Sequence, residues 1–279
     1  MVVLGAGTVA ALYVLVVRTS RGQRLDQAAL LRVDADPALT RGIASVLNDL
    51  TIGLSIAVLA VCMVVSLLRG RLAYAIAAAA LVGGANVTTQ LLKRELLTRP
   101  DLGYSTTNSL PSGHTTVAVS LALALLLVAP RFSRGVLVLV GSVGATIVGV
   151  GVVVAGWHRP SDVLASVGVC LAWAGLVSLC LLLRTGTPGH DASTPRTGRP
   201  SGPGSQAQMN SPERRSGPGV HPVLALTGAV VAVALAFGYG VRPDGTWRDL
   251  VVHGCTLSAI AVGTALCLAL TARVVPVDR

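Results

Sequence analysis

Charged residues are scarce in this sequence: only 12% of its 279 residues are Asp, Glu, Lys or Arg. A water-soluble domain carries about 25%, so these charges are too few to cover a water-facing surface. Aromatic residues make up only 3%, and the apolar mass consists of Ala, Val, Leu and Gly, which suits helices packed closely in lipid. The composition therefore argues against a soluble single-domain enzyme, a disordered protein and a disulfide scaffold.

The sequence also lacks a cysteine pattern typical of metal sites. All five cysteines lie in apolar stretches without Cys-x-x-Cys spacing, so we interpret them as small buried side chains. The net charge of +10 would indicate nucleic acid in a soluble protein. Here the basic residues lie between apolar runs, where loop charge and contact with lipid headgroups explain them better. We expect a membrane bilayer, and no nucleic acid, as the partner.

Long apolar runs are abundant instead. A helix needs about 20 apolar residues to cross the hydrocarbon, and the sequence predicts eight such spans: 2–17, 43–68, 72–92, 114–130, 135–156, 163–183, 222–241 and 250–272. Residues 185–221 are rich in Gly, Pro, Ser and Thr and predict a flexible linker. The expected fold is an all-α polytopic bundle, with a six-span unit over 1–184 and a two-span C-terminal appendage over 222–279.

Loop charges predict the sidedness. Basic residues divide evenly between the two sides, but the loops 69–71 and 131–134 contain no acidic residue, and short basic loops stay in the cytoplasm. We therefore place the linker and both termini in the cytoplasm and the other loops outside. The outer loop 18–42 is either an amphipathic interfacial helix over the site or an irregular loop.

Three short polar segments fall in outward loops. Lys93 to Pro100 ends the third span, Pro111-Ser112-Gly113-His114 begins the fourth, and His158-Arg159-Pro160-Ser161-Asp162 begins the sixth. Each alone has an ordinary interpretation, because helix caps and headgroup contacts use the same residues.

Together these segments predict a site for phosphoryl transfer. Ser112 is a good N-cap, and Gly113 leaves the first amides of a helix open to an anion. Asp162 lies one helical turn after His158 and can hold the imidazole Nδ1–H, leaving Nε2 as nucleophile or base. Cationic side chains stabilise charge on the phosphoryl oxygens.

These segments resemble the motifs of the type-2 phosphatidic acid phosphatase superfamily, integral-membrane relatives of vanadium haloperoxidases, over roughly residues 43–183. That family has Lys, six residues, Arg-Pro; then Pro-Ser-Gly-His; then Ser-Arg, five residues, His, three residues, Asp. The resemblance implies that Lys93, Arg99, Ser112 and Gly113 bind phosphate and that His114 is the general acid. It also implies that His158 forms a phosphohistidine oriented by Asp162, without metal or other cofactor.

Two departures stand out. Five residues, not six, separate Lys93 from Arg99, and Gly151-Val152 stands where the family has Ser-Arg. Arg159 or Arg94 are candidate substitutes for the missing arginine.

We therefore expect a plasma-membrane lipid phosphatase that hydrolyses a lipid phosphate or pyrophosphate monoester at the outer face. The alternatives are an impaired relative that binds lipid phosphate without hydrolysis and a transporter component.

Overall fold

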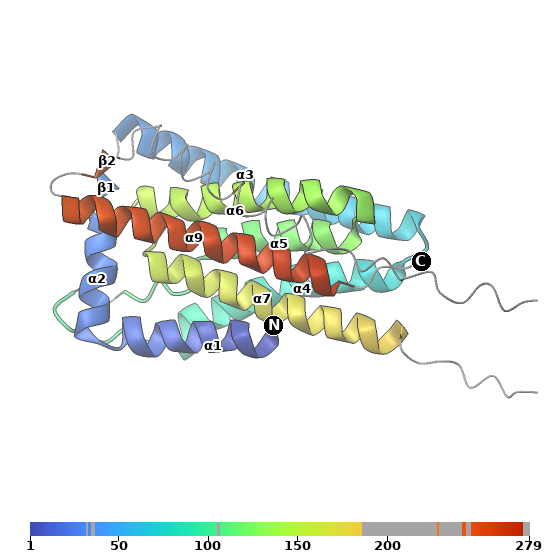
Figure 1. Cartoon of the computed structure of the whole chain (residues 1–279), viewed down its shortest axis with the longest axis horizontal. Helices are drawn as coiled ribbons and strands as arrows, with labels where there is room; N and C mark the ends of the chain where they lie inside the picture. Colours follow the sequence, from blue (N-terminus) through green and yellow to red (C-terminus); the bar gives the residue numbers. More distant parts are fainter. Residues whose placement is uncertain are drawn as a thin grey trace, which may run out of the picture.

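A computed structural model describes residues 1–31, 33–34, 37–104, 107–185, 228, 242–243 and 247–275. These residues are almost wholly helical and form an elongated bundle (Figure 1). The elements in chain order are α1 (Val2–Leu12), η1 (Tyr13–Val17), α2 (Ser20–Leu31), β1 (Val33–Asp34), α3 (Pro37–Leu68), α4 (Leu72–Leu91), η2 (Leu92–Leu96), α5 (Gly113–Val128), η3 (Arg131–Ser133), α6 (Arg134–Val154), α7 (Pro160–Thr185), β2 (Arg242–Pro243) and α9 (Trp247–Val274). Among them only β1 and β2 pair as strands, antiparallel over two residues, so the prediction of an all-α fold is confirmed.

Several of these helices have the length and apolarity of membrane spans. Four in the described part qualify alone: Leu72–Leu96, Arg131–Val154, Pro160–Arg184 and Val251–Val274. A fifth candidate is the N-terminal helix Val2–Val17 taken with α2, although the two are bent by 95°. Shorter apolar helices cover Ser55–Leu68 and Gly113–Val128. The chain is therefore an integral, multi-pass membrane protein.

Two predicted segments fall largely outside the described residues. Of the linker over 185–221 only residue 185 is described, and of the span over 222–241 only Gly228. Gly228 lies against Leu139 and Val143 of α6.

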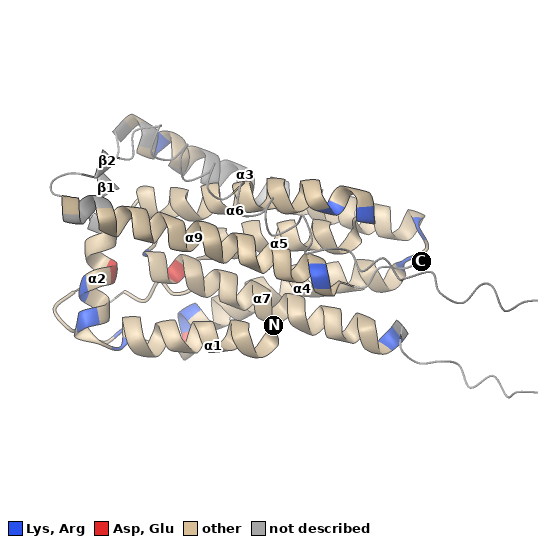
Figure 2. Ribbon diagram, in the orientation of Figure 1, with Lys and Arg blue, Asp and Glu red and all other residues tan. Residues whose placement is uncertain are grey.

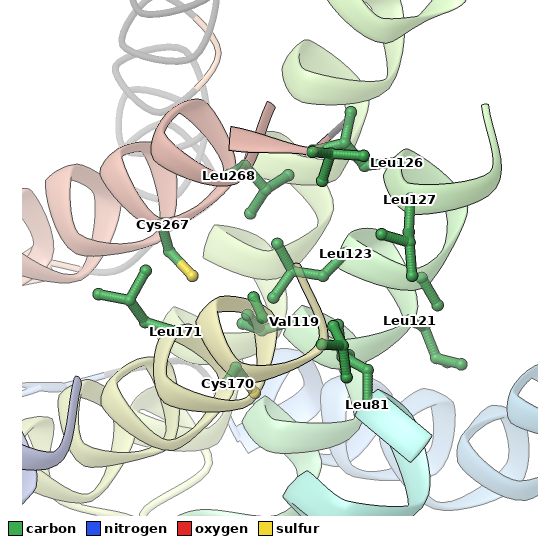
Figure 3. Packing of buried hydrophobic residues seen from close by; sticks show 14 of the residues in the cluster. Leu81, Val119, Leu121, Leu123, Leu126, Leu127, Cys170, Leu171, Cys267 and Leu268 are labelled. Atoms are coloured by element: carbon green, nitrogen blue, oxygen red, sulfur yellow. The ribbon is translucent and has the colours of Figure 1, made fainter. Parts of the chain in front are cut away.

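The apolar core surrounds α5. Leu81 from α4, Val119 and Leu123 from α5, Cys170 from α7 and Leu268 from α9 belong to a single buried cluster (Figure 3). Cys62 and Cys267 are buried too. The interpretation of every cysteine as buried is wrong for Cys180 and Cys255, which are exposed on the bundle surface, because a lipid-facing position accepts a small apolar side chain as readily as the core does.

The C-terminal helix α9 packs directly on α6 and α7, the two helices that the third polar segment joins. It lies against α6 and α7 in Figure 1 and contacts both along their length. The hydroxyls of Thr146 in α6 and Thr264 in α9 are 2.8 Å apart and hydrogen-bonded. Leu257 and Ile260 of α9 share a buried cluster with Val152 at the end of α6. This helix therefore builds part of the wall behind the site.

Charged side chains gather at the two ends of the bundle (Figure 2). The end where α4 and α6 begin and α7 and α9 finish carries only basic residues in the described part, namely Arg69, Arg71, Arg131, Arg134, Arg184 and Arg273. The opposite end carries both signs, including Asp26 and Asp162, and it is there that the three polar segments lie. The bundle thus has one basic end and one mixed end.

Helices α1 and α7 touch backbone to backbone. An added Cβ on Gly5 would stand 2.3 Å from the Gly168 carbonyl oxygen, and one on Gly168 would stand 2.9 Å from that of Gly5. Small residues allow such close approach, which supplies packing energy where lipid removes the hydrophobic drive.

We predict that Gly5→Ala lowers the melting temperature in detergent, because the new methyl group forces the two backbones apart at a cost of about 1–3 kcal/mol. Gly7→Ala on the same helix is the matched control, since a Cβ there meets nothing within 4 Å. Thermal unfolding followed by circular dichroism compares them, and equal melting temperatures would contradict the packing argument.

Candidate functional site

The three polar segments meet at the mixed end of the bundle. One follows α4, the second begins α5 and the third joins α6 to α7. The Ser112 N–H donates to the backbone carbonyl of Asp162 at 3.0 Å. The Ser166 hydroxyl bonds both that carbonyl, at 2.9 Å, and the carbonyl of Ser112, at 2.7 Å. The N-termini of α5 and α7 are thereby fixed side by side.

His158 and Asp162 form the hydrogen bond that their spacing predicts. His158 Nδ1 is 3.2 Å from Asp162 Oδ2, and both side chains are buried. The same oxygen accepts from the Arg159 N–H at 2.9 Å and the Ser109 hydroxyl at 2.6 Å. With Nδ1–H donating to Asp162, the Nε2 lone pair is free of any partner in the described part of the chain. His158 therefore presents an Nε2 lone pair in a fixed orientation, which is the arrangement that a histidine nucleophile requires.

The start of α5 is built as the sequence predicts. Ser112 is the N-cap, and its hydroxyl accepts from the Thr115 N–H at 3.4 Å and the Thr115 hydroxyl at 3.1 Å. A Cβ on Gly113 would meet only Gln90 Nε2, at 3.5 Å. Protein packing therefore does not require glycine here, and the space before its amide is open to a ligand. Ser112 itself is fully buried and already bonded.

Arg99 is the most unusual group of the site. Its side chain is only 7% exposed, yet its Nε and Nη2 have no hydrogen-bond partner within the described residues. Burial lowers the pKa of the Arg99 guanidinium, and the nearby charge of Arg159 lowers it further. The carboxylates of Asp26 and Asp162 act in the opposite direction and raise this pKa, but neither bonds the guanidinium in the described part of the chain, and a buried guanidinium without hydrogen-bond partners is costly.

Arg159 and Arg94, the two candidate substitutes, lie in different surroundings. Arg159 is buried, donating through Nη1 to the Ser109 hydroxyl and through Nε to Gln27 Oε1, both at 3.0 Å. Arg94 is exposed on η2 and has no bond to other described residues. The structure thus brings Arg159, and not Arg94, to the pair of histidine and aspartate.

Lys93 lies in the π-helical turn η2. Such turns widen the helix by one residue and occur frequently at functional sites. Asn108 fixes this segment, because its Nδ2 donates to the carbonyls of Lys93 at 3.0 Å and Leu97 at 2.9 Å. The five-residue spacing between Lys93 and Arg99 therefore includes a turn that is not α-helical.

His114, in the first turn of α5 at the polar end, packs on Trp157 with ring centroids 5.3 Å apart. Burial lowers the pKa of His114, and nearby His158 and Lys93 lower it further. The second imidazole thus lies within electrostatic range of both the first imidazole and the lysine.

Val152 occupies the position of the missing arginine. It is fully buried in the apolar cluster with α9, and its carbonyl accepts from the N–H groups of Trp157, at 3.0 Å, and His158, at 3.1 Å. The family motif has an arginine at this position, and this chain has a valine that packs in the apolar cluster instead.

The polar side chains of α2 are the part of the site that sequence reasoning missed. Of the two interpretations of residues 18–42, the helix is correct for Ser20–Leu31. Asp26 accepts from the Ser161 N–H at 3.1 Å and from its hydroxyl at 2.6 Å, so it caps the first turn of α7. The spacing of Gln23, Asp26 and Gln27 on one helical face was the available signal. The charged residues around these positions made the polar face hard to recognise in the sequence.

No cluster of three or more His, Cys, Asp or Glu side chains suited to a metal ion occurs among the residues that the structure describes.

Comparison with known proteins gives one match. A family model described as the PAP2 superfamily matches residues 70–185, the stretch that contains all three polar segments. No curated protein matches the chain, and no solved structure does.

We predict that Gly113→Ala weakens binding of inorganic phosphate roughly tenfold, because a methyl group blocks one charge-assisted hydrogen bond from the helix end. The melting temperature should stay level, since a Cβ at this position meets only Gln90 Nε2, at an ordinary van der Waals distance of 3.5 Å. Gly144→Ala, where a Cβ meets nothing within 4 Å, is the control for the substitution itself. Calorimetric titration with phosphate checks this, and unchanged affinity would exclude the amide as a ligand.

Asp26 gives a second prediction. Burial raises the pKa of Asp26 to about 6, with a contribution from Asp162. Between about pH 4 and 6, Asp26 is protonated in the folded protein and ionised in the unfolded chain. The free energy of unfolding that this group contributes therefore falls as pH rises through that window. Asn keeps an oxygen that accepts from Ser161 but does not titrate.

The stability of Asp26→Asn relative to the unmodified protein should thus increase by on the order of 2 kcal/mol between pH 4 and 7. Unfolding at several pH values measures this difference. A pH-independent difference would show that Asp26 has an ordinary pKa.

Proposed function

From the PAP2 superfamily domain at residues 70–185, we propose that this membrane protein is a lipid phosphatase that releases phosphate from a lipid phosphate or pyrophosphate. The observation that carries the proposal is Arg99, buried without a hydrogen-bond partner in the described part of the chain and set close to Arg159. An anion with several oxygens satisfies two guanidinium groups together, and phosphate does so bidentately.

The reaction begins with the phosphate held by Lys93, Arg99, Arg159 and the amide of Gly113. His158 Nε2 attacks phosphorus; the P–N bond forms as the bond between phosphorus and the leaving oxygen breaks. Protonated His114 gives its proton to that oxygen. Asp162 keeps Nδ1–H directed to itself and stabilises the imidazolium that forms.

Water then attacks the phosphohistidine. His114, now neutral, accepts a proton from the water as the P–N bond breaks, and inorganic phosphate leaves. The lowered pKa of His114 favours its neutral form, which is the form that accepts a proton from water in this step.

An apolar cavity supports a lipid as substrate. A space of about 410 Å³ lies between α1, α4 and α7, with Val9, Tyr13, Leu92, Leu97 and Val169 among its lining residues. Leu92 and Leu97 flank the segment that bears Lys93. A hydrocarbon chain in this cavity would lie next to the segment that bears Lys93.

The basic end supports the orientation. Its arginines stand without acidic neighbours in the described part, and such loops remain in the cytoplasm. The catalytic end then faces outward from the plasma membrane.

The test is phosphate release by the purified full-length protein from phosphatidic acid, phosphatidylglycerol phosphate and a polyprenyl pyrophosphate, with chelator present. His158→Ala should lose at least about a thousandfold in turnover, as expected when a nucleophile is removed. Arg184→Gln, exposed at the opposite end, controls for expression and handling and should retain turnover. Equal rates in the unmodified protein and His158→Ala would end the enzyme interpretation.

Val152 favours one other candidate, a relative that binds lipid phosphate without hydrolysis. Phosphate binding that depends on Arg99, together with no release from any of these lipids, would identify it.

A further inference from the structure

Helix α2 turns one polar stripe toward the site. Gln23, Asp26 and Gln27 follow i, i+3, i+4 spacing and share one helical face. Gln23 Nε2 donates to the carbonyls of Val17 at 2.8 Å and Pro100 at 3.0 Å. Each of the three side chains thus reaches a segment next to a phosphate ligand: Gln23 beside Arg99, Asp26 at the start of α7, and Gln27 at Arg159.

We propose that Gln27 is a positioning residue that holds Arg159 in the phosphate site, where Arg159 replaces the cation absent at Val152. This inference rests on the proposed function and adds to it an element outside the matched residues 70–185. No family motif in the sequence extends to α2.

The hydrogen bonds of Arg159 leave its charge available. Gln27 Oε1 and Ser109 Oγ each accept one of its N–H groups at 3.0 Å, and both partners are neutral. Within the described residues, Nη2 donates to no acceptor. The guanidinium is therefore fixed in direction but not paired with a carboxylate, which is what an anion ligand requires.

Ser109 links this arrangement to the nucleophile. Its hydroxyl accepts from Arg159 and donates to Asp162 Oδ2 at 2.6 Å, the oxygen that also holds His158. This serine is the side-chain link from the guanidinium to the histidine, and the Arg159 N–H bonds the same Asp162 oxygen from the backbone, so Gln27 acts mainly on phosphate binding.

The anchoring of α2 makes Gln27 a rigid partner. Gln23 is fully buried and Asp26 is 6% exposed, and both bond to backbone groups of other segments. Because the two flank the same helical face, the backbone beneath Gln27 is fixed before any ligand arrives. The positioning therefore costs little ordering on binding.

The experiment is a double-mutant cycle of Gln27→Met and Arg159→Ala, with inorganic phosphate as the probe. Binding is measured by calorimetry on the detergent-solubilised full chain, so no turnover is needed. Gln27→Met should raise the Kd for phosphate roughly tenfold, as expected on losing one hydrogen bond to a charged group, but should have no further effect in Arg159→Ala. Such non-additivity shows that Gln27 acts through Arg159.

Arg24→Met is the matched control, because Arg24 is exposed on the same helix and receives the same new side chain. Its Kd should equal that of the unmodified protein. Gln27→Asn, whose amide is one methylene short of Arg159, should behave like Gln27→Met and provides a second variant if methionine disturbs folding.

Three results would overturn the proposal: equal effects of Gln27→Met in both backgrounds, no effect of either Gln27 variant, or an equal loss in Arg24→Met. The proposed function fails separately, if the unmodified protein binds phosphate but releases none from lipid. In that case the cycle still decides whether Gln27 positions Arg159.

Discussion

Asp162 joins the loops that form the site. One of its carboxylate oxygens accepts three hydrogen bonds, from Ser109, Arg159 and His158, and its carbonyl accepts from Ser112 and Ser166. A fully buried carboxylate is tolerated only when it is so bonded. The orientation of His158 and the position of Ser109 depend on this carboxylate, and the meeting of α5 with α7 depends on the backbone carbonyl of the same residue.

Around Asp162, buried groups of both charges lie close enough to interact. Arg99 and Arg159 are both buried, and the acceptors of Arg159 are a serine and a glutamine. Arg159 is thus held in direction by neutral partners, whereas Arg99 keeps Nε and Nη2 without a hydrogen-bond partner in the described part of the chain. Buried polar groups without partners lower the stability of a protein, a common cost at functional sites.

Short-range features of this site could be predicted from the sequence, and long-range ones could not. The cap at Ser112 and the bond between His158 and Asp162 follow from neighbouring residues and helical spacing. The contact of Gln27 with Arg159 joins positions 132 residues apart, and nothing in local propensity specifies it. The sequence makes Arg159 a candidate only because Val152 stands where the family has an arginine. The direction in which its guanidinium points depends on Gln27 and Ser109, which only the fold brings to it.

The fold shows the same division. Apolar runs predict the helices, including α9, because burial in lipid requires about 20 apolar residues. They do not reveal that α9 lies against α6 and α7, since a uniformly apolar helix has no face that indicates its neighbour. The 95° bend between the N-terminal helix and α2, by contrast, has local determinants: the Thr19 hydroxyl accepts from the Gly22 N–H at 3.0 Å, and a Cβ on Gly22 would stand 2.4 Å from the Leu15 carbonyl oxygen.

The small ladder of β1 and β2 has a consequence for how the molecule divides. It pairs Val33 with Pro243, so the residues just after α2 are hydrogen-bonded to residues shortly before α9. Excising the matched segment 70–185 by itself would discard both the helix that bears Gln27 and the helix that backs Val152. The unit that builds the candidate site therefore extends beyond residues 70–185, and the segments on its two sides are joined by the four residues of β1 and β2.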